Sequence, residues 1–280
     1  MNIFKSSNYL VHRFPEHNVD TPTLRVSELA YRFGNVDALL GISFEVNTKE
    51  RLAVVGPNGA GKSTLFKIIA GVLKPTQGLV QIYGYEPKGH ICIAYVPQRN
   101  MVDWAFPVNV ADVIMMGRVS KLGPLRWPSS KDWEIVRHSL ELVEMEQFAK
   151  RQINELSGGQ QQRIFIAQAL AQEAELILMD EPLTGLDFNT QQEIFRILDM
   201  LREKRVTVLI AMHDLKLASE RFDRVLLLNK HQIGFGLPQD VFIPENLSQA
   251  YGNHLRMLTT KEGTLVIEDT CCEEGDHSHA

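Results

Sequence analysis

The chain has 280 residues, of which 44% are hydrophobic and 22% charged, the composition of an ordinary soluble globular protein. Its formal net charge of -5 excludes the global basic field that draws proteins to nucleic acid or anionic lipid. Because no apolar run reaches the roughly eighteen residues of a membrane helix, we expect an intracellular protein whose link to any membrane runs through a partner.

Short strands dominate the first third of the sequence. Residues 1–21 carry charges and a proline where a signal peptide would have its apolar stretch, so we expect a polar arm there. Apolar segments broken by turns then predict strands, with one helix at 61–73. The predicted strands are 23–33, 41–46, 51–56, 79–84 and 91–96.

From residue 97 onward, apolar residues recur at helical intervals, and beyond residue 174 strands alternate with helices. We predict helices at 109–118, 130–149 and 157–173, within a helical subdomain of about 98–172. The alternation that follows is typical of βαβ units, so the prediction is an α/β core with a mainly parallel sheet, interrupted by that subdomain. The core ends near residue 252, and we expect the polar end of the 253–280 extension to be disordered.

A glycine-rich stretch, "GPNGAGKST", lies between a predicted strand and a predicted helix. Glycines let the backbone wrap closely around phosphate, and the helix adds its positive dipole end. In such a Walker A P-loop, Lys62 bridges the β- and γ-phosphates and the Ser63 hydroxyl is a ligand of Mg²⁺. The alternative is a plain glycine-rich turn. The residues expected around the phosphates are Gly56, Pro57, Asn58, Gly59, Ala60, Gly61, Lys62, Ser63 and Thr64.

Three further segments place polar side chains after buried strands, where ligands of open α/β sheets bind. Asp180 ends the apolar strand "ELILMD" and is the candidate Mg²⁺ carboxylate, and Glu181 is the candidate base that orients water. His213 ends "VTVLIAMH" and is a candidate γ-phosphate contact, although a lone histidine there is usually structural. Gln98 follows "ICIAYV" and is a candidate ligand of Mg²⁺ or of the water. Without a P-loop, the acidic pair would be a solvated turn.

Together with "YVPQ", "LSGGQ", "LTGLD" and "AMHD", these motifs resemble the ATP-binding cassette family from residue 23 to about 252. The resemblance implies a P-loop NTPase core with an N-terminal antiparallel β region and the inserted helical subdomain. It implies two subunits joined head to tail, each ATP lying between one P-loop and the partner's "LSGGQ". The N-cap preference of serine and the helix dipole fit that role. The residues serving the partner's ATP would be Ser157, Gly158, Gly159 and Gln160.

The same resemblance assigns Asp187, in "LTGLD", to signalling across the dimer interface. It also implies an aromatic side chain that stacks on adenine, for which Phe33 in "YRFG" fits best and Tyr31 is the second choice. A core role for either aromatic residue is the alternative.

The work done by ATP is predicted from the stretch after Gln98, which is apolar and aromatic at Met101, Trp104 and Phe106. In the family, a helix of a separate permease docks there. The stretch is most similar to manganese, zinc and iron(II) importers, which implies a motor on the cytoplasmic face of the membrane and an extracytoplasmic metal-binding protein. The alternative is a mechanical ATPase acting on DNA or ribosomes. The acidic net charge, the single cassette and the lack of long heptad repeats disfavour it.

The tail "CCEEGDHSHA" contains Cys271, Cys272, His277 and His279, all plausible metal ligands. Their spacing differs from the C-x-x-C of structural zinc sites, so the tail is predicted to be a disordered polar segment. A regulatory metal sensor is the minority hypothesis. The remaining cysteine, Cys92, completes no disulfide framework, which favours a reducing compartment.

Overall fold

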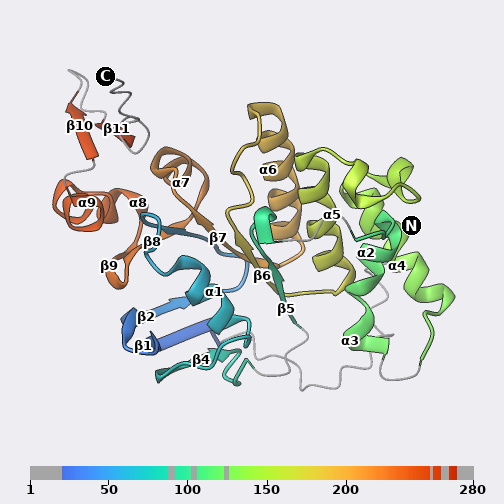
Figure 1. Cartoon of the computed structure of the whole chain (residues 1–280), viewed down its shortest axis with the longest axis horizontal. Coiled ribbons are helices and arrows are strands. Elements are labelled where there is room, and N and C mark those ends of the chain that lie inside the picture. The colour runs from blue at the N-terminus through green and yellow to red at the C-terminus, as the bar shows by residue number, and fades with distance from the viewer. Residues whose placement is uncertain are drawn as a thin grey trace, which may run out of the picture.

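The computed structural model describes residues 21–87, 92–101, 106–122, 126–252, 255–259 and 265–269. Within these residues, nine strands form one sheet in the order β4-β1-β2-β9-β8-β3-β7-β6-β5, and β10 pairs with β11 (Figure 1). The strands are β1 Leu24–Phe33, β2 Val36–Val46, β3 Arg51–Val55, β4 Gln77–Ile82, β5 Ile93–Val96, β6 Leu176–Asp180, β7 Thr207–Met212, β8 Arg224–Asn229, β9 His231–Gly236, β10 Leu255–Thr259 and β11 Leu265–Asp269. The helices are α1 Lys62–Ile69, α2 Val110–Met116, α3 Val119–Leu122, α4 Ser130–Leu142, α5 Gly158–Ala171, α6 Phe188–Glu203, α7 Leu215–Arg221, α8 Pro238–Val241 and α9 Pro244–Tyr251.

The middle of the sheet is parallel, as predicted. Strand β3 pairs in parallel with β7 and β8, and β6 pairs in parallel with β7 and β5. Every residue of β6 and β7 is buried, which explains their continuous apolar runs, because strands covered on both faces do not alternate. The α/β class predicted from the sequence is confirmed.

Strands β1, β2 and β4 form an antiparallel region beside the parallel strands, in agreement with the expected fold. A tight turn at Gly34, whose φ is 58°, joins β1 to β2, and Phe33 pairs with Val36 across it. Helix α1 packs between this region and the parallel strands, with Leu65, Phe66 and Ile69 fully buried.

Two hydrophobic cores lie on opposite faces of the sheet. Strand β3 contributes Ala53 and Val55 to one core and Leu52 and Val54 to the other, because successive side chains of a strand point to opposite faces. Helices α2, α4, α5 and α6 cover the first core (Figure 1). Burying each large aliphatic side chain stabilises the fold by about 1.5–3 kcal/mol, so both faces hold the strand ends in place.

Several element boundaries differ from the prediction. The helix expected at 130–149 ends at Leu142, because Glu144 adopts a left-handed φ of 56°. Helix α1 ends at Ile69, shortly before Gly71, whose φ is 73°. Strand β9, helices α8 and α9 and the β10–β11 pair were not predicted.

Ion pairs hold the helical region together. The Arg118 guanidinium, which is 6% exposed, donates to Asp132 Oδ1 (3.2 Å), Glu173 Oε2 (2.7 Å) and the Ala171 carbonyl (2.9 Å). Lys121 also pairs with Glu173. Arg118 follows α2, Asp132 lies in the first turn of α4, and Glu173 follows α5. Three helices are therefore joined around one buried cation.

Candidate nucleotide-binding site

The glycine-rich stretch forms a loop between β3 and α1. Gly59 and Gly61 have φ values of 79° and 98°, which favour glycine. A Cβ atom at Gly56 would lie 2.0 Å from the Leu228 carbonyl oxygen, whereas one at Gly59 would meet nothing within 4 Å. No side chain caps the start of α1, so its first amide groups are available to an anion.

Lys62 lies across this loop. Its Nζ donates to the carbonyl oxygens of Gly56 (2.6 Å) and Pro57 (3.1 Å), and the residue is 5% exposed. Burial lowers the pKa of Lys62, and the negative charges of Glu181 and Asp180 oppose that shift. The loop therefore holds a buried ammonium group next to two carboxylates.

The carboxyl ends of three strands meet beside the loop. Val55, the last residue of β3, pairs with Met212 on β7, and Ala211 pairs with Asp180 on β6. The predicted residues Asp180, Glu181 and His213 therefore lie at one edge of the sheet, next to Gly56. His213 is exposed there.

Asp180 is 4% exposed. Among the residues that the structure describes, the one hydrogen bond to its carboxylate comes from the Tyr95 hydroxyl, at 3.4 Å. Burial, reinforced by the Asp180 charge, raises the pKa of Tyr95, so the phenol keeps its proton and donates. A buried carboxylate with one long neutral hydrogen bond favours a nearby cation, and its oxygens are the donors that Mg²⁺ prefers.

Glu181 and Gln98 are brought together from different elements. Gln98 Nε2 donates to Glu181 Oε2 at 2.8 Å, and both side chains are half-buried. Glu181 has a φ of 50°, a conformation that is uncommon for a non-glycine residue, and its amide donates to the Ala211 carbonyl at 3.0 Å. The turn after β6 thus directs the Glu181 carboxylate toward Gln98.

The "LSGGQ" segment begins α5, with Ser157 as its N-cap. Ser157 Oγ accepts from the Gln160 amide (3.4 Å), and Gln160 Oε1 accepts from the Ser157 amide (2.9 Å), which forms a capping box. The predicted N-cap is therefore confirmed. No hydrogen bond in the described part of the chain joins residues 157–160 to the P-loop. Within one chain, the described residues of "LSGGQ" and of the P-loop are therefore not linked by a hydrogen bond.

Both glycines of this segment are closely packed. A Cβ at Gly158 would lie 2.8 Å from Arg99 Nη1, and one at Gly159 would lie 2.1 Å from Thr190 Cγ2. Thr190 in turn donates through Oγ1 to Asp187 Oδ2 (2.7 Å). Asp187 is the N-cap of α6, and its hydrogen bonds from the Thr190 side chain and amide lower its pKa.

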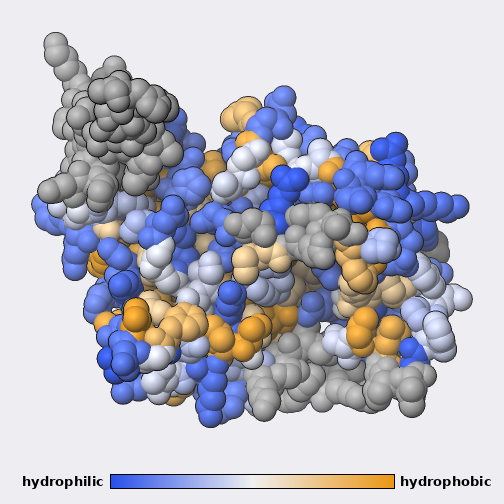
Figure 2. Space-filling model, in the orientation of Figure 1, coloured by the Kyte–Doolittle hydropathy of each residue, from blue (hydrophilic) through white to orange (hydrophobic). Residues whose placement is uncertain are grey.

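Phe33 is 54% exposed, and its ring meets Tyr31 edge to face with centroids 4.8 Å apart. It is not a core residue and offers exposed aromatic surface. Met101 (68% exposed) and Phe106 (57% exposed) are also accessible, while Trp104 lies outside the described residues. Figure 2 shows hydrophobic side chains over the α2–α3 region, where Val119 is 61% exposed.

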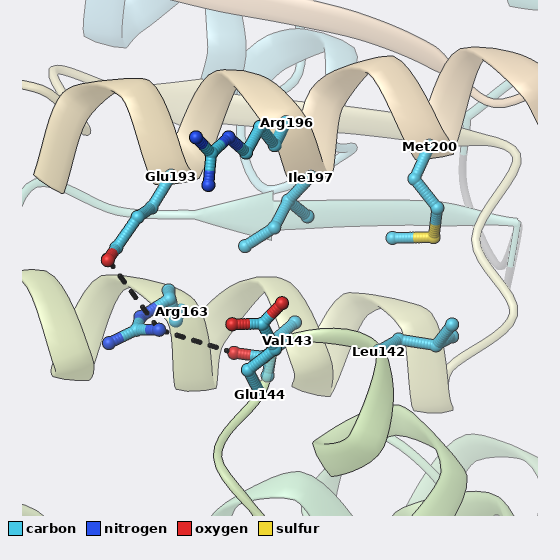
Figure 3. A pocket seen from close by; sticks show the side chains of 8 residues that line it. All are labelled: Leu142, Val143, Glu144, Arg163, Glu193, Arg196, Ile197 and Met200. Atoms are coloured by element: carbon cyan, nitrogen blue, oxygen red, sulfur yellow. Dashed lines mark hydrogen bonds and ion pairs between the residues drawn. The ribbon is translucent and has the colours of Figure 1, made fainter. Parts of the chain in front are cut away.

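A pocket of about 150 Å³ lies away from these motifs, between the end of α4, α5 and α6. Figure 3 shows Arg163 of α5 beside Glu193 of α6, with an Nη1–Oε2 distance of 3.6 Å. Arg163 Nη1 also donates to the Val143 carbonyl at 3.5 Å. The pocket belongs to the packing of α5 against α6.

Sequence reasoning missed three residues at the site, namely Tyr95, Arg99 and Thr190. Tyr95 begins the "YVPQ" motif, but only the pairing of β5 with β6 brings its hydroxyl to Asp180. The only sequence signal for Arg99 and Thr190 was indirect, since a pair of glycines marks close packing as well as phosphate contact.

The tail residues Cys271, Cys272, His277 and His279 lie outside the described residues. Within those described, no cluster of three or more histidine, cysteine, aspartate or glutamate side chains could hold a metal ion. No helix among them is long and apolar enough to span a membrane.

Comparison with known proteins identifies the family of the chain. The family described as ABC transporter matches residues 39–184. The manganese transport system ATP-binding protein MntB of Bacillus subtilis is 46% identical over 224 residues, covering 80% of this chain and 90% of that protein. The zinc transport system ATP-binding protein TroB of Treponema pallidum is 42% identical over 233 residues, covering 83% and 88%.

Among solved structures, cbiO1 from Clostridium perfringens, part of the ABC transporter complex cbiONQ, superposes with a TM-score of 0.70 at 28% identity. The match covers 82% of this chain and 94% of that one. The family match, the relatives and the fold together show that the chain belongs to the ABC transporter family as an ATP-hydrolysing subunit.

Proposed function

We propose that this chain is the motor of a divalent metal importer, with manganese the first candidate cargo and zinc or iron(II) the next. The observation that carries the proposal is the likeness, above 40% identity, to proteins named as manganese and zinc transport ATP-binding subunits. The chain would act through permease subunits, on the cytoplasmic face of the membrane, and with an extracytoplasmic metal-binding protein.

The phosphates of ATP fit the P-loop, because α1 starts without a side-chain cap and Gly59 faces open space. We propose that Lys62 exchanges its two carbonyl contacts for the β- and γ-phosphates, and that the backbone N–H groups of residues 56–64 other than Pro57 complete the cradle. Phe33, with its exposed ring, would stack on adenine, with Tyr31 as the second choice.

Mg²⁺ fits the oxygen donors of Ser63, Asp180 and Gln98, and when bound it would neutralise charge on the phosphates. Glu181 would orient the attacking water and accept its proton, and His213 would contact the γ-phosphate. Gln98 already donates to Glu181 at 2.8 Å. We propose that this hydrogen bond breaks when the helical subdomain of about 98–172 moves relative to the core, because Gln98 lies where the two meet.

The second half of each site would come from another copy of the chain. The N-terminus of α5 would face the partner's ATP through Ser157, Gly158, Gly159 and Gln160. Because each ATP then contacts both chains, ATP would hold the two copies together. Asp187, at the N-terminus of α6, would lie at the same interface.

The cargo is tested by uptake of radiolabelled manganese and zinc in cells that carry the wild type, Lys62→Ala or Lys74→Ala in place of the native copy. Lys62→Ala removes the buried ammonium, while Lys74 is exposed and serves as the matched control. We expect manganese uptake to fall to background with Lys62→Ala and to persist with Lys74→Ala. If neither metal's uptake changes in cells without a second importer, the proposed cargo is wrong.

A further inference from the structure

Arg99 connects two motifs that the proposed function uses separately. It follows Gln98, whose amide donates to Glu181, and it begins a short 3₁₀ turn at Arg99–Met101. Arg99 Nε donates to Gln161 Oε1 at 3.0 Å, on the first turn of α5. The same guanidinium covers Gly158, where a Cβ would lie 2.8 Å from Nη1 and 3.2 Å from Cζ.

Gln161 is a suitable anchor for this contact. It is 4% exposed, and its Nε2 donates to the Ile153 carbonyl at 3.1 Å. The amide orientation is fixed by that bond, so Oε1 faces Arg99. A charged donor on a fixed acceptor is among the stronger hydrogen bonds in proteins.

A second side of the α5 N-terminus has a different kind of contact. There Gly159 packs against the methyl of Thr190, a β-branched and therefore stiff side chain. The Arg99 side instead consists of a long side chain and hydrogen bonds. The first turn of α5 thus lies between a rigid apolar contact and an adjustable polar one, and the adjustable contact belongs to the residue after Gln98.

We propose that Arg99 is a positioning residue, which ties the Gln98–Glu181 contact to the orientation of Ser157 and Gly158. Because Gln98 and Arg99 are joined by one peptide bond, a shift of Gln98 at the ATP site moves the guanidinium that holds the α5 N-terminus. This inference rests on the proposed function, in which the α5 N-terminus binds the partner's ATP. It predicts that Arg99 affects assembly of the ATP-bound dimer without affecting nucleotide binding by the P-loop.

The test uses ATP-dependent dimerisation of the full chain in a Glu181→Gln background, measured by sedimentation velocity. Arg99→Ala should weaken the dimer on the order of tenfold or more, the effect of losing a charged hydrogen bond. Arg99→Lys should not restore it, because lysine lacks the planar fork. Arg137→Ala, at an exposed arginine of α4, is the matched control and should leave dimerisation unchanged. Full restoration by Arg99→Lys would overturn the positioning role.

Two measurements distinguish a positioning role of Arg99 from a role in the stability of the fold alone. The affinity of the monomer for a fluorescent ATP analogue should be the same with and without Arg99→Ala, and its melting temperature should fall by only the few degrees that loss of one hydrogen bond causes. Gly158→Ala should weaken the dimer at least as much as Arg99→Ala, because its methyl displaces the guanidinium and also lies on the surface proposed to bind the partner's ATP. Adding Arg99→Ala to Gly158→Ala should weaken the dimer no further. Additive losses, or an equal loss of monomer ATP affinity, would overturn the inference.

The same experiment distinguishes a failure of the Arg99 inference from a failure of the proposed dimer. If the Glu181→Gln parent stays monomeric with ATP, the proposed dimer fails and the inference falls with it. If the parent dimerises and Arg99→Ala dimerises equally well, the inference alone is wrong.

Discussion

Replacing Gly159 by alanine should destabilise the protein, and the structure names the atom responsible. The new Cβ would lie 2.1 Å from Thr190 Cγ2, whereas two carbons in contact lie about 3.5–4.0 Å apart. Overlap of this kind costs about 1–3 kcal/mol, and the better helix propensity of alanine returns about 0.5–1 kcal/mol. A contact of 2.1 Å lies at the severe end of that range, so we expect a net loss of about 2 kcal/mol. It is measured as a lower urea midpoint followed by circular dichroism.

Thr190→Ser, combined with Gly159→Ala, tests whether the Thr190 methyl causes the loss of stability. It removes Cγ2 and leaves Cβ at 3.4 Å and the hydroxyl at 3.5 Å from the new methyl, which is close to ordinary contact. The serine hydroxyl can still donate to Asp187. Gly159→Ala combined with Thr190→Ser should therefore regain most of the lost stability. Gly158→Ala is the control and should lose less, because the guanidinium opposite it can move. A Gly159→Ala variant as stable as the wild type, or one that Thr190→Ser fails to improve, would refute the reasoning.

Three further predictions concern single side chains. Tyr95→Phe should weaken Mn²⁺ binding to the ATP-loaded chain by roughly tenfold, measured by electron paramagnetic resonance, since it removes the hydrogen bond to Asp180; unchanged binding would contradict that role. Burial raises the pKa of Glu173, but Lys121 and Arg118 together more than offset that effect, and the pKa of Glu173 is lowered from the usual 4.5. A lowered folded pKa stabilises the fold above pH 4.5, and this contribution is lost as the pH falls through the folded value. Glu173→Gln should therefore be less stable at neutral pH and lose less stability on acidification in urea unfolding, whereas an unchanged acid slope would argue against the ion pair. Phe33→Ala should lower ATP affinity roughly tenfold or more through lost stacking and leave binding of inorganic triphosphate unchanged, as competition assays would show.

The sequence was most informative where chemistry is local. The P-loop, Asp180 and Glu181 each follow an apolar strand, and the edge shared by parallel strands follows from that pattern. The N-cap at Ser157 could likewise be predicted from the sequence, because a serine directly before a helix is a local signal. These features need no knowledge of strand order.

Contacts between distant segments could not be predicted in the same way. Arg99 and Gly158 lie far apart in the chain, and Gly159 meets Thr190 only because α5 and α6 pack side by side. The family resemblance predicts that the glycines of "LSGGQ" serve the partner's ATP, and the structure adds a packing reason for both. The end of α4 at Leu142 was also missed, since the apolar period continues past Glu144 while the backbone there turns left-handed.

The central claim is that each ATP site is shared by two copies of the chain, and mixing two inactive variants tests it most directly. In a Glu181→Gln background, Lys62→Ala disables the P-loop, and Ser157→Asp keeps an N-cap acceptor but places a carboxylate against the partner's phosphate. Neither variant alone should retain ATP through gel filtration. The mixture contains dimers with one intact site and should retain one ATP per such dimer. A mixture that retains no more ATP than its components would contradict the shared site.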